Sequence, residues 1–300
     1  MTAVGRALLA RRELQLADGT RRWYLVTEPE TATAPYPLVV QLHGFGEGAE
    51  FHARATGLSA YGAVRGFMTV VPDGTLPSSS DAPQWATTVG DNADAEFLEA
   101  LIAEAIARWP IDPDRVYVVG MSNGALLGSV LACRLPHRIA ATALVAGARF
   151  PRSATPKRAV PTVVVHGTKD PLVPFEGGPT RAEAVRSEAD LRRAGPGRAD
   201  EDLRDLDPPA MPQMIDEWAG RHGATRAGPQ RRNAGLVVTE WQRDGVKLFA
   251  LCELQRHGHS WPGAAAYRGL EDLLGPMVED FPTNELVWKF LSQHRLPAVE

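Results

Sequence analysis

Cysteine, long apolar runs and an excess of basic residues are all missing from this sequence. Its two cysteines, Cys133 and Cys252, are too few for a disulfide framework or a zinc site, and we interpret both as buried thiols. No apolar run approaches the roughly 18 residues that a membrane-spanning helix needs. Acidic residues outnumber basic ones by 36 to 32, whereas nucleic-acid-binding proteins normally carry a basic excess or stripe. We therefore expect a protein that uses neither a membrane nor a nucleic acid as its partner.

The composition that is present is typical of a globular protein. Of the 300 residues, 44% are apolar and 23% are charged, which excludes disordered and fibrous chains. This length suits a single α/β domain, 1–300, with an elaboration. Near the N-terminus the apolar segment Ala7-Leu8-Leu9-Ala10 is shorter than the stretch of about 7 to 15 residues in a secretory signal. The sequence thus predicts a cytoplasmic protein, or a secreted one if a signal has been removed.

Apolar runs alternate with helical patterns along most of the chain. The clearest helical pattern is 94–109, where Phe97, Leu101 and Ala105 recur at helical spacing, and a second amphipathic pattern covers 284–294. Near the start, 12–17 and 22–27 flank Asp18-Gly19, a pair typical of a hairpin turn. Continuous apolar runs, which are typical of strands buried on both faces, cover 37–42, 67–71, 115–120, 140–146 and 161–165. Two further strand patterns cover 236–241 and 246–251. The order predicts a mostly parallel, doubly wound α/β sheet with an N-terminal antiparallel ribbon.

One charged segment interrupts this alternation. Between positions 179 and 207, six Arg and eight acidic residues stand among 29, with few large apolar side chains. Such a segment buries too little surface to offset its ordering entropy. We interpret about 176–210 as a polar surface insertion, in preference to a substrate-binding lid.

The segment Gly120-Met121-Ser122-Asn123-Gly124 carries the strongest chemical signal. The G-x-S-x-G pattern arises often by chance, but here a predicted strand precedes it and a helical pattern, 125–135, follows it. A sharp strand-to-helix turn exposes a serine hydroxyl at the carboxyl edge of a sheet, and the flanking glycines leave room for that turn. Ser122 is therefore the candidate nucleophile.

A nucleophilic serine needs a base and a group that orients the base. In serine hydrolases of this kind the acid and then the histidine follow the serine, each at the end of a later strand. Asp170 follows the strand pattern that ends at Val165, although an aspartate that only caps its turn fits as well. After the last strand pattern, His257 and His259 are both candidates for the base.

Two backbone amides are expected to receive the oxyanion of such a reaction. One follows the nucleophile, at Asn123, and the other belongs to Phe45 in the loop after the strand that ends near His43. We interpret His43 as a residue that braces this loop. The other histidines lack a matching context and are interpreted as surface or loop-bracing residues: His52, His137, His166, His222 and His294.

Several of these segments together resemble a known family. The sequence is similar to the polyhydroxybutyrate depolymerase and feruloyl esterase group of α/β-hydrolases over about 20–294. The resemblance implies that Ser122 is the nucleophile, Asp170 the acid and His259, not His257, the base. The sequence departs from the family at Ala125, where a second glycine is frequent, and at Arg256-His257, where glycines are usual before the base. The segments that carry it are Leu38-Val-Val-Gln-Leu-His-Gly44, Val71-Pro-Asp-Gly74, Trp109-Pro-Ile-Asp-Pro-Asp-Arg-Val-Tyr-Val118, Gly120-Met-Ser-Asn-Gly124, His166-Gly-Thr-Lys-Asp-Pro-Leu-Val-Pro174 and Gly258-His-Ser-Trp-Pro-Gly263.

The expected activity is that of a serine carboxylic ester hydrolase without metal or cofactor. Small or oligomeric esters are the expected substrates, with hydroxyalkanoate, feruloyl or acetyl groups. Trp85, Phe175 and Trp261 are candidates for substrate contact, because aromatic rings stack on phenolic and acyl groups, although core packing explains such residues too. A serine peptidase on the same fold and a non-catalytic hydrolase-like binding protein are the alternatives.

Overall fold

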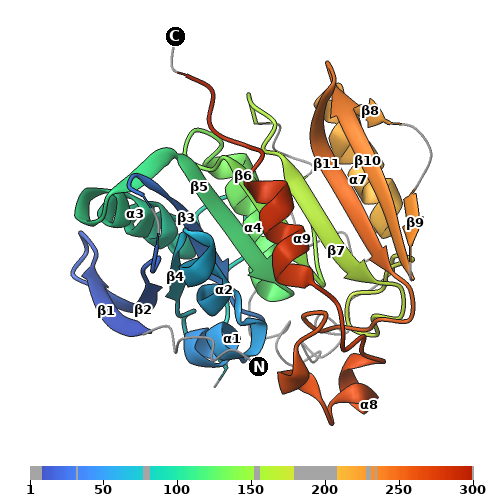
Figure 1. Ribbon diagram of the computed structural model, residues 1–300, viewed down its shortest axis with the longest axis horizontal. Coiled ribbons are helices and arrows are strands. Elements are labelled where there is room, and N and C mark those ends of the chain that lie inside the picture. Colours follow the sequence, from blue (N-terminus) through green and yellow to red (C-terminus); the bar gives the residue numbers. More distant parts are fainter. Residues whose placement is uncertain are drawn as a thin grey trace, which may run out of the picture.

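The computed structural model describes residues 9–31, 33–76, 82–151, 156–178, 208–227, 231–233 and 235–298. The predicted insertion at about 176–210 lies almost entirely outside these residues. Within them, eleven strands form one sheet in the order β1-β2-β4-β3-β5-β6-β7-β11-β10-β8, and β9 pairs with β10 (Figure 1).

The centre of the sheet is parallel. Four of its six strands are buried along their whole length, because helices cover both faces, and this explains their continuous apolar sequences. The predicted mostly parallel sheet is confirmed. The parallel strands are β3 (Tyr36–Leu42), β4 (Met68–Pro72), β5 (Ile111–Met121), β6 (Ala141–Val145), β7 (Thr162–Gly167) and β11 (Val246–Leu254).

Antiparallel strands complete both edges. The predicted ribbon is confirmed as β1 (Ala10–Gln15) and β2 (Arg21–Thr27), and β2 pairs with β4. Gly19 has a φ of +87°, which suits glycine, and Asp18 accepts a hydrogen bond from the Thr20 amide at 2.8 Å. At the other edge, β10 (Leu236–Arg243) pairs with β11, β8 (Thr225–Arg226) and β9 (Arg231–Asn233).

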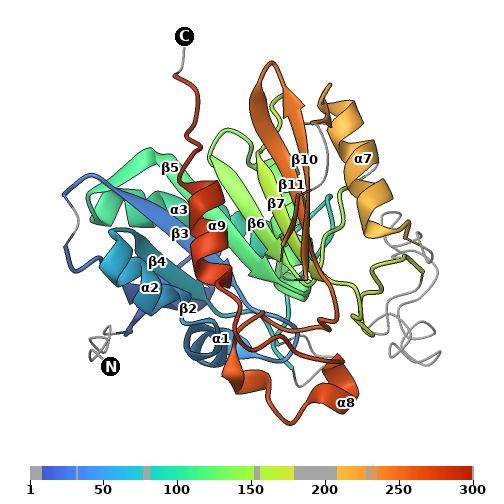
Figure 2. The same cartoon turned by 45° about the vertical axis from the view of Figure 1, so that its right-hand side comes forward.

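Helices cover the two faces of the sheet. On one face α3 (Ala93–Arg108), α4 (Asn123–Arg134) and α7 (Met211–Arg221) bury side chains that include Val40, Val118 and Val164. On the other, α2 (Leu58–Arg65) and α9 (Thr283–Leu291) pack on Tyr117, Val119 and their neighbours (Figure 2). Successive strand residues thus alternate between two cores, which is the three-layer arrangement of an α/β domain.

Two short helices and a one-turn element lie at the carboxyl end of the parallel strands. They are α1 (Gly48–Thr56), α8 (Glu271–Leu274) and the 3₁₀ turn η2 (Ala265–Tyr267). In Figure 1 the arrowheads of β5 and β7 point toward the end of the molecule where α1 and α8 lie. Loops that follow parallel strands are the usual place for a functional site in an open α/β sheet.

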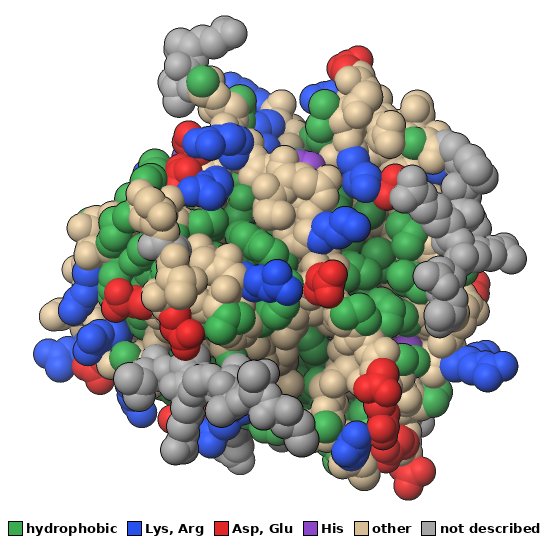
Figure 3. All heavy atoms as spheres, in the orientation of Figure 1, with side chains coloured by type: hydrophobic (Ala, Val, Ile, Leu, Met, Phe, Trp, Pro, Cys, Tyr) green, Lys and Arg blue, Asp and Glu red, His purple; other side chains and the backbone are tan. Residues whose placement is uncertain are grey.

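The described surface is mixed in charge. Lys, Arg, Asp and Glu side chains are all distributed over the face in Figure 3. None of the helices in the described residues combines the length and the hydropathy that a membrane span requires. Both cysteines are free; Cys252 is buried and Cys133 is partly buried.

Candidate active site

Ser122 occupies a sharp turn between a strand and a helix. Strand β5 ends at Met121 and α4 begins at Asn123, so Ser122 is the single residue between them. Its backbone has a φ of 51° and a ψ of −118°, and its amide donates to the Val145 carbonyl at 2.9 Å. A non-glycine residue held in this conformation is strained, and such strain is typical of functional positions.

The glycines of the motif permit this turn because backbone approaches both of them closely. A Cβ atom at Gly120 would lie 2.3 Å from the Gly124 carbonyl oxygen, and one at Gly124 would lie 2.3 Å from the Leu42 carbonyl oxygen. The close approach at Gly120 lies within the turn, between the end of β5 and the first residues of α4. The close approach at Gly124 packs the start of α4 against the end of β3, where the loop containing Phe45 begins. Both glycines are therefore required by packing.

His259 lies between the hydroxyl of Ser122 and the carboxylate of Asp170. Its Nε2 atom is 2.8 Å from Ser122 Oγ, and its Nδ1 atom is 2.7 Å from Asp170 Oδ2. The loop that carries it follows β11, and the His259 amide donates to the Leu274 carbonyl in α8. The structure thus brings together the three side chains that the sequence singled out.

Both carboxylate oxygens of Asp170 accept hydrogen bonds. Its Oδ1 accepts from the amides of Leu172 and Val173 at 2.8 Å each, and the His166 ring lies 3.3 Å from Oδ2. Burial would raise the pKa of Asp170, but hydrogen bonds from His166 and His259 outweigh it and hold that pKa well below its usual range. The ionised carboxylate only accepts, so His259 carries its proton on Nδ1, and Nε2 is left to accept the proton of Ser122.

The neighbouring His257 has a bracing role instead. Its Nδ1 accepts from the Val278 amide at 3.0 Å, so the proton is on Nε2, which is 3.1 Å from the Ser260 carbonyl. Burial lowers the pKa of His257 and keeps its ring neutral. Between the two candidate bases, only His259 reaches Ser122.

Four of the remaining histidines are buried, whereas His294 is partly buried and His137 is exposed. His43 braces its loop as expected: it is fully buried, with Nδ1 2.7 Å from the Gly44 carbonyl and Nε2 accepting from the Gly74 amide at 2.8 Å. Of the two positions that the sequence left open, surface or loop-bracing, burial excludes the surface position for His52, His166 and His222. His166 does brace a loop, because its Nε2 donates to the Val173 carbonyl at 2.9 Å.

The two candidate oxyanion donors, the amides of Phe45 and Asn123, belong to segments that hydrogen bonds hold in place. The side-chain amide of Asn123 pairs with the backbone of Trp85, accepting at 2.7 Å and donating at 3.2 Å. Gly46 donates to the Pro83 carbonyl at 2.8 Å, which anchors the loop around Phe45. Among the described residues, neither the Phe45 amide nor the Asn123 amide donates to another backbone group. These two N–H groups are available to an anion.

The three aromatic candidates for substrate contact are packed inside the molecule. Each is at most 6% exposed, and each has its ring against a histidine: Trp85 on His43, Phe175 on His166 and Trp261 on His52. Trp85 also donates its indole N–H to the His43 carbonyl at 3.0 Å. Substrate contact by these rings stays a prediction, and packing already explains their positions.

Other apolar side chains are exposed on the segments that follow β3 and β11. The side chain of Phe45 is 55% exposed, and the backbone amide of the same residue is a candidate oxyanion donor. Phe51, Leu270 and Leu273 are also exposed, and Leu273 precedes the residue whose carbonyl holds the His259 amide. Single exposed apolar residues are common on protein surfaces.

A further carboxylate, the partly buried Glu47, was not recognised in the sequence. Its oxygens accept from the Gly44 amide at 3.0 Å, from the Tyr267 hydroxyl at 2.7 Å and from the His52 ring at 3.1 Å. Burial would raise the pKa of Glu47, but these hydrogen bonds and the His52 ring lower it to about 2. The only local signal is its place directly after the loop His43–Gly46.

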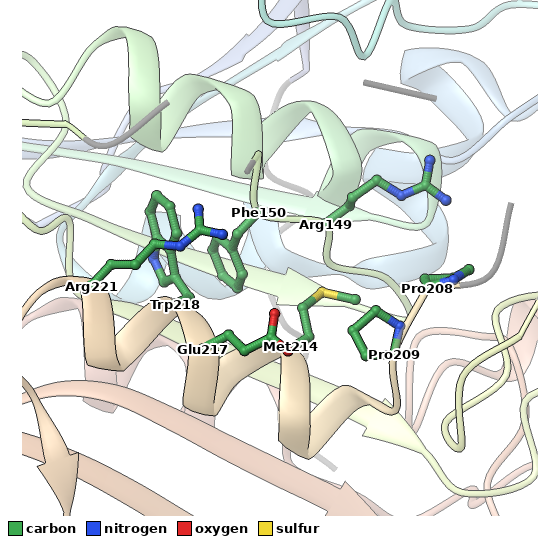
Figure 4. Close-up of a pocket in the computed structure, with 8 residues that line it drawn as sticks. All are labelled: Arg149, Phe150, Pro208, Pro209, Met214, Glu217, Trp218 and Arg221. Atoms are coloured by element: carbon green, nitrogen blue, oxygen red, sulfur yellow. The ribbon is translucent and has the colours of Figure 1, made fainter. Parts of the chain in front are cut away.

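A small hollow lies elsewhere on the same domain. It is formed between α7 and the segment after β6, where the rings of Phe150 and Trp218 stack at 4.8 Å (Figure 4). Ser122, Asp170 and His259 do not line it. In the described part of the chain, no group of three or more His, Cys, Asp or Glu side chains is arranged to hold a metal ion.

We expect Gly120→Ala to destabilise the fold and disturb the turn at Ser122. The added methyl group would meet backbone atoms that cannot move alone, and such overpacking costs about 1–3 kcal/mol. Urea unfolding measures this loss. The matched control is Gly220→Ala in α7, where nothing lies within 4 Å of the new methyl group, and a gain of about 0.5–1 kcal/mol is expected. Equal stabilities for the two variants would contradict the packing argument.

Stability at acid pH should depend on Glu47. Its folded pKa of about 2 lies below the ordinary value of 4.5, so the ionised form stabilises the fold above about pH 4.5. This contribution is lost as the pH falls toward 2. In Glu47→Gln we therefore expect a free energy of unfolding that varies less between about pH 3 and 5 than in the wild type. Parallel curves from urea unfolding at each pH would contradict the assignment.

Comparison with known proteins agrees with this fold. The model of the family described as "Esterase PHB depolymerase" matches residues 22–187. "Putative esterase NocK" of Nocardia uniformis subsp. tsuyamanensis is 30% identical over 281 residues, which cover 87% of this chain and 76% of that protein. "Feruloyl esterase B" of Neurospora crassa is 32% identical over 132 residues, but the match covers only 42% of this chain and 44% of the relative.

Among solved structures, "Acetyl xylan esterase from Aspergillus awamori" is similar with a TM-score of 0.59. The similarity covers 88% of this chain and 97% of that one, and at 14% sequence identity it bears on the fold alone. The fold is thus that of an α/β-hydrolase. With the family match over more than half of its length, the chain belongs to the esterase PHB depolymerase family and is a carboxylic ester hydrolase.

Proposed function

We propose that this enzyme hydrolyses esters through an acyl-enzyme formed on Ser122, with His259 as base and Asp170 as the residue that orients it. The single observation that carries the proposal is the pair of contacts made by one imidazole ring. Nε2 lies 2.8 Å from the Ser122 hydroxyl and Nδ1 lies 2.7 Å from the Asp170 carboxylate. Both distances are within the range for proton transfer between a nucleophile, a base and an orienting group.

In the first half of the reaction, Ser122 Oγ attacks the ester carbonyl carbon while its proton moves to Nε2 of His259. The ionised Asp170 stabilises the imidazolium that forms and keeps the ring in place. The negative charge that develops on the carbonyl oxygen faces the amides of Phe45 and Asn123. His259 then gives its proton to the leaving alcohol, and the acyl group remains on Ser122.

The second half repeats these steps with water. His259 removes a proton from a water molecule, whose oxygen attacks the acyl-enzyme, and the same two amides receive the charge. The carboxylic acid leaves when His259 returns its proton to Ser122. Apart from the ester and the water molecule, every step uses groups that the chain itself supplies.

For the substrate, we propose small or oligomeric esters with a hydroxyalkanoate, feruloyl or acetyl group. The names of the matched family and of the Neurospora crassa relative support hydroxybutyrate and feruloyl esters. The exposed ring of Phe45 lies on the loop that supplies an oxyanion donor, so an aromatic or apolar part of the substrate would meet it close to the reacting carbonyl. This argument favours esters with an apolar acyl or alcohol group.

Ser122→Ala is expected to abolish ester hydrolysis. Removing the nucleophile of a triad lowers kcat by about a million-fold. The rate on p-nitrophenyl acetate and the melting temperature of the purified protein measure activity and folding separately. Ser292→Ala, an exposed serine at the end of α9, is the control and should keep full activity. A folded Ser122→Ala protein with a tenth of the wild-type rate would remove Ser122 from this role.

A substrate panel tests the proposed range and the contribution of Phe45. It contains p-nitrophenyl acetate, methyl ferulate, acetylated xylose, a hydroxybutyrate dimer and an aminoacyl anilide. We expect hydrolysis of esters and not of the anilide, which a serine peptidase would cleave. In Phe45→Ala, which retains the backbone amide, KM should rise for methyl ferulate by up to about 10-fold, because one aromatic contact contributes about 0.5–1.5 kcal/mol. An equal change for acetylated xylose, which has no aromatic ring, would argue against stacking.

A further inference from the structure

Glu47 joins three chain segments that lie around the reacting groups. It directly follows the loop His43–Gly46, and its side chain is only 13% exposed. The carboxylate accepts from the Gly44 amide in that loop, from His52 in α1 and from Tyr267 in η2. Tyr267 is 220 positions away in the sequence, so this contact connects distant parts of the chain.

Each of the three donors lies next to a group of the proposed reaction, or contacts a residue close to one in the sequence. Gly44 immediately precedes Phe45, whose amide is a candidate oxyanion donor. The Tyr267 hydroxyl is also 3.2 Å from the sulfur of Met121, the residue before the nucleophile. The His52 ring packs edge-on against Trp261, two residues after the base. No other described carboxylate combines contacts to all three segments.

We infer that Glu47 is a positioning residue that holds the loop His43–Gly46 against Tyr267 and thereby fixes the Phe45 amide where the oxyanion forms. The inference rests on the proposed function of Ser122. Hydrogen bonds to an ionised carboxylate are shorter and stronger than neutral ones, and here one carboxylate receives three of them. The loop can approach because position 44 is glycine: a Cβ atom there would lie 3.2 Å from the Glu47 carboxyl carbon.

Substitution of such a positioning residue should destabilise the transition state more than it weakens substrate binding. The oxyanion exists only after Ser122 has attacked, so a displaced Phe45 amide weakens the intermediate and leaves the bound ester almost unchanged. Small displacements matter because oxyanion donors act at hydrogen-bond distance. Substitution of a residue with a merely structural role would instead lower the stability of the protein without a selective loss of transition-state stabilisation.

The test compares two ligands in Glu47→Gln, which has the same size but no charge. The first is a trifluoromethyl ketone, to which Ser122 Oγ adds: a carbon–oxygen bond forms, the serine proton moves to His259, and the carbonyl π pair becomes the oxyanion. The second is the corresponding secondary alcohol, which binds without reaction. We expect kcat and the affinity for the ketone to fall together by about 10- to 100-fold, less than complete loss of a donor would cause. KM and the affinity for the alcohol should stay within about twofold.

Two further variants separate positioning from stability. Tyr267→Phe removes one of the three donors and should produce the same pattern with a smaller loss, which keeps the test usable if Glu47→Gln does not fold. Asp112→Asn is the control, since Asp112 is a buried carboxylate near the start of β5, bonded to Arg115 at 2.6 Å. It should lower stability and leave kcat and ketone affinity unchanged.

Unchanged kcat and ketone affinity in folded Glu47→Gln or Tyr267→Phe would overturn the inference. So would equal losses for the ketone and the alcohol, because these would indicate general damage to the site. A wild-type enzyme that forms no adduct with the ketone, as seen by fluorine NMR, would instead contradict the proposed function of Ser122. The two failures are therefore distinguishable.

Discussion

The hydrogen bond between Asp170 and His259 is the interaction on which the rest of the site depends. At 2.7 Å it joins the loops after β7 and β11, two strands that are direct neighbours in the sheet. Because the carboxylate is saturated with donors and stays ionised, the imidazole proton is held on Nδ1 and Nε2 faces Ser122 as an acceptor. One electrostatic constraint thus determines both the tautomer of the base and the direction in which it can take a proton.

The architecture supports this contact through close backbone packing. A Cβ atom at Gly167 would lie 2.2 Å from the His257 carbonyl oxygen, and one at Gly258 would lie 2.0 Å from the Leu274 carbonyl oxygen. The turns that carry the acid and the base therefore pack directly against each other and against α8. On the other side of Ser122, the Asn123 side chain ties the nucleophile to the Trp85 backbone. Hydrogen bonds or close backbone contacts thus hold the groups to which we assign the reaction, and the proposed oxyanion stabilisation requires such preorganisation.

Much of this could be predicted from the sequence because the relevant signals are local. Continuous apolar runs identified β3, β6 and β7, helical spacing identified α3, and the glycines around Ser122 identified the turn. The helices α1 and α2 were not predicted, since they have only nine and eight residues and give too short a pattern to recognise. Glu47 could not be recognised either, because its partner Tyr267 lies 220 positions away. The burial of Trp85 and Trp261 depends on the histidine rings they pack against, which no local pattern reveals.

The most direct test of the Ser122 mechanism is to locate the covalent adduct of a fluorophosphonate. The intact enzyme is treated with the reagent, digested, and sequenced by mass spectrometry. The account predicts one modified residue, Ser122, and loss of the adduct when His259 is replaced by alanine. Modification of another serine, or none on a folded and active enzyme, would contradict it.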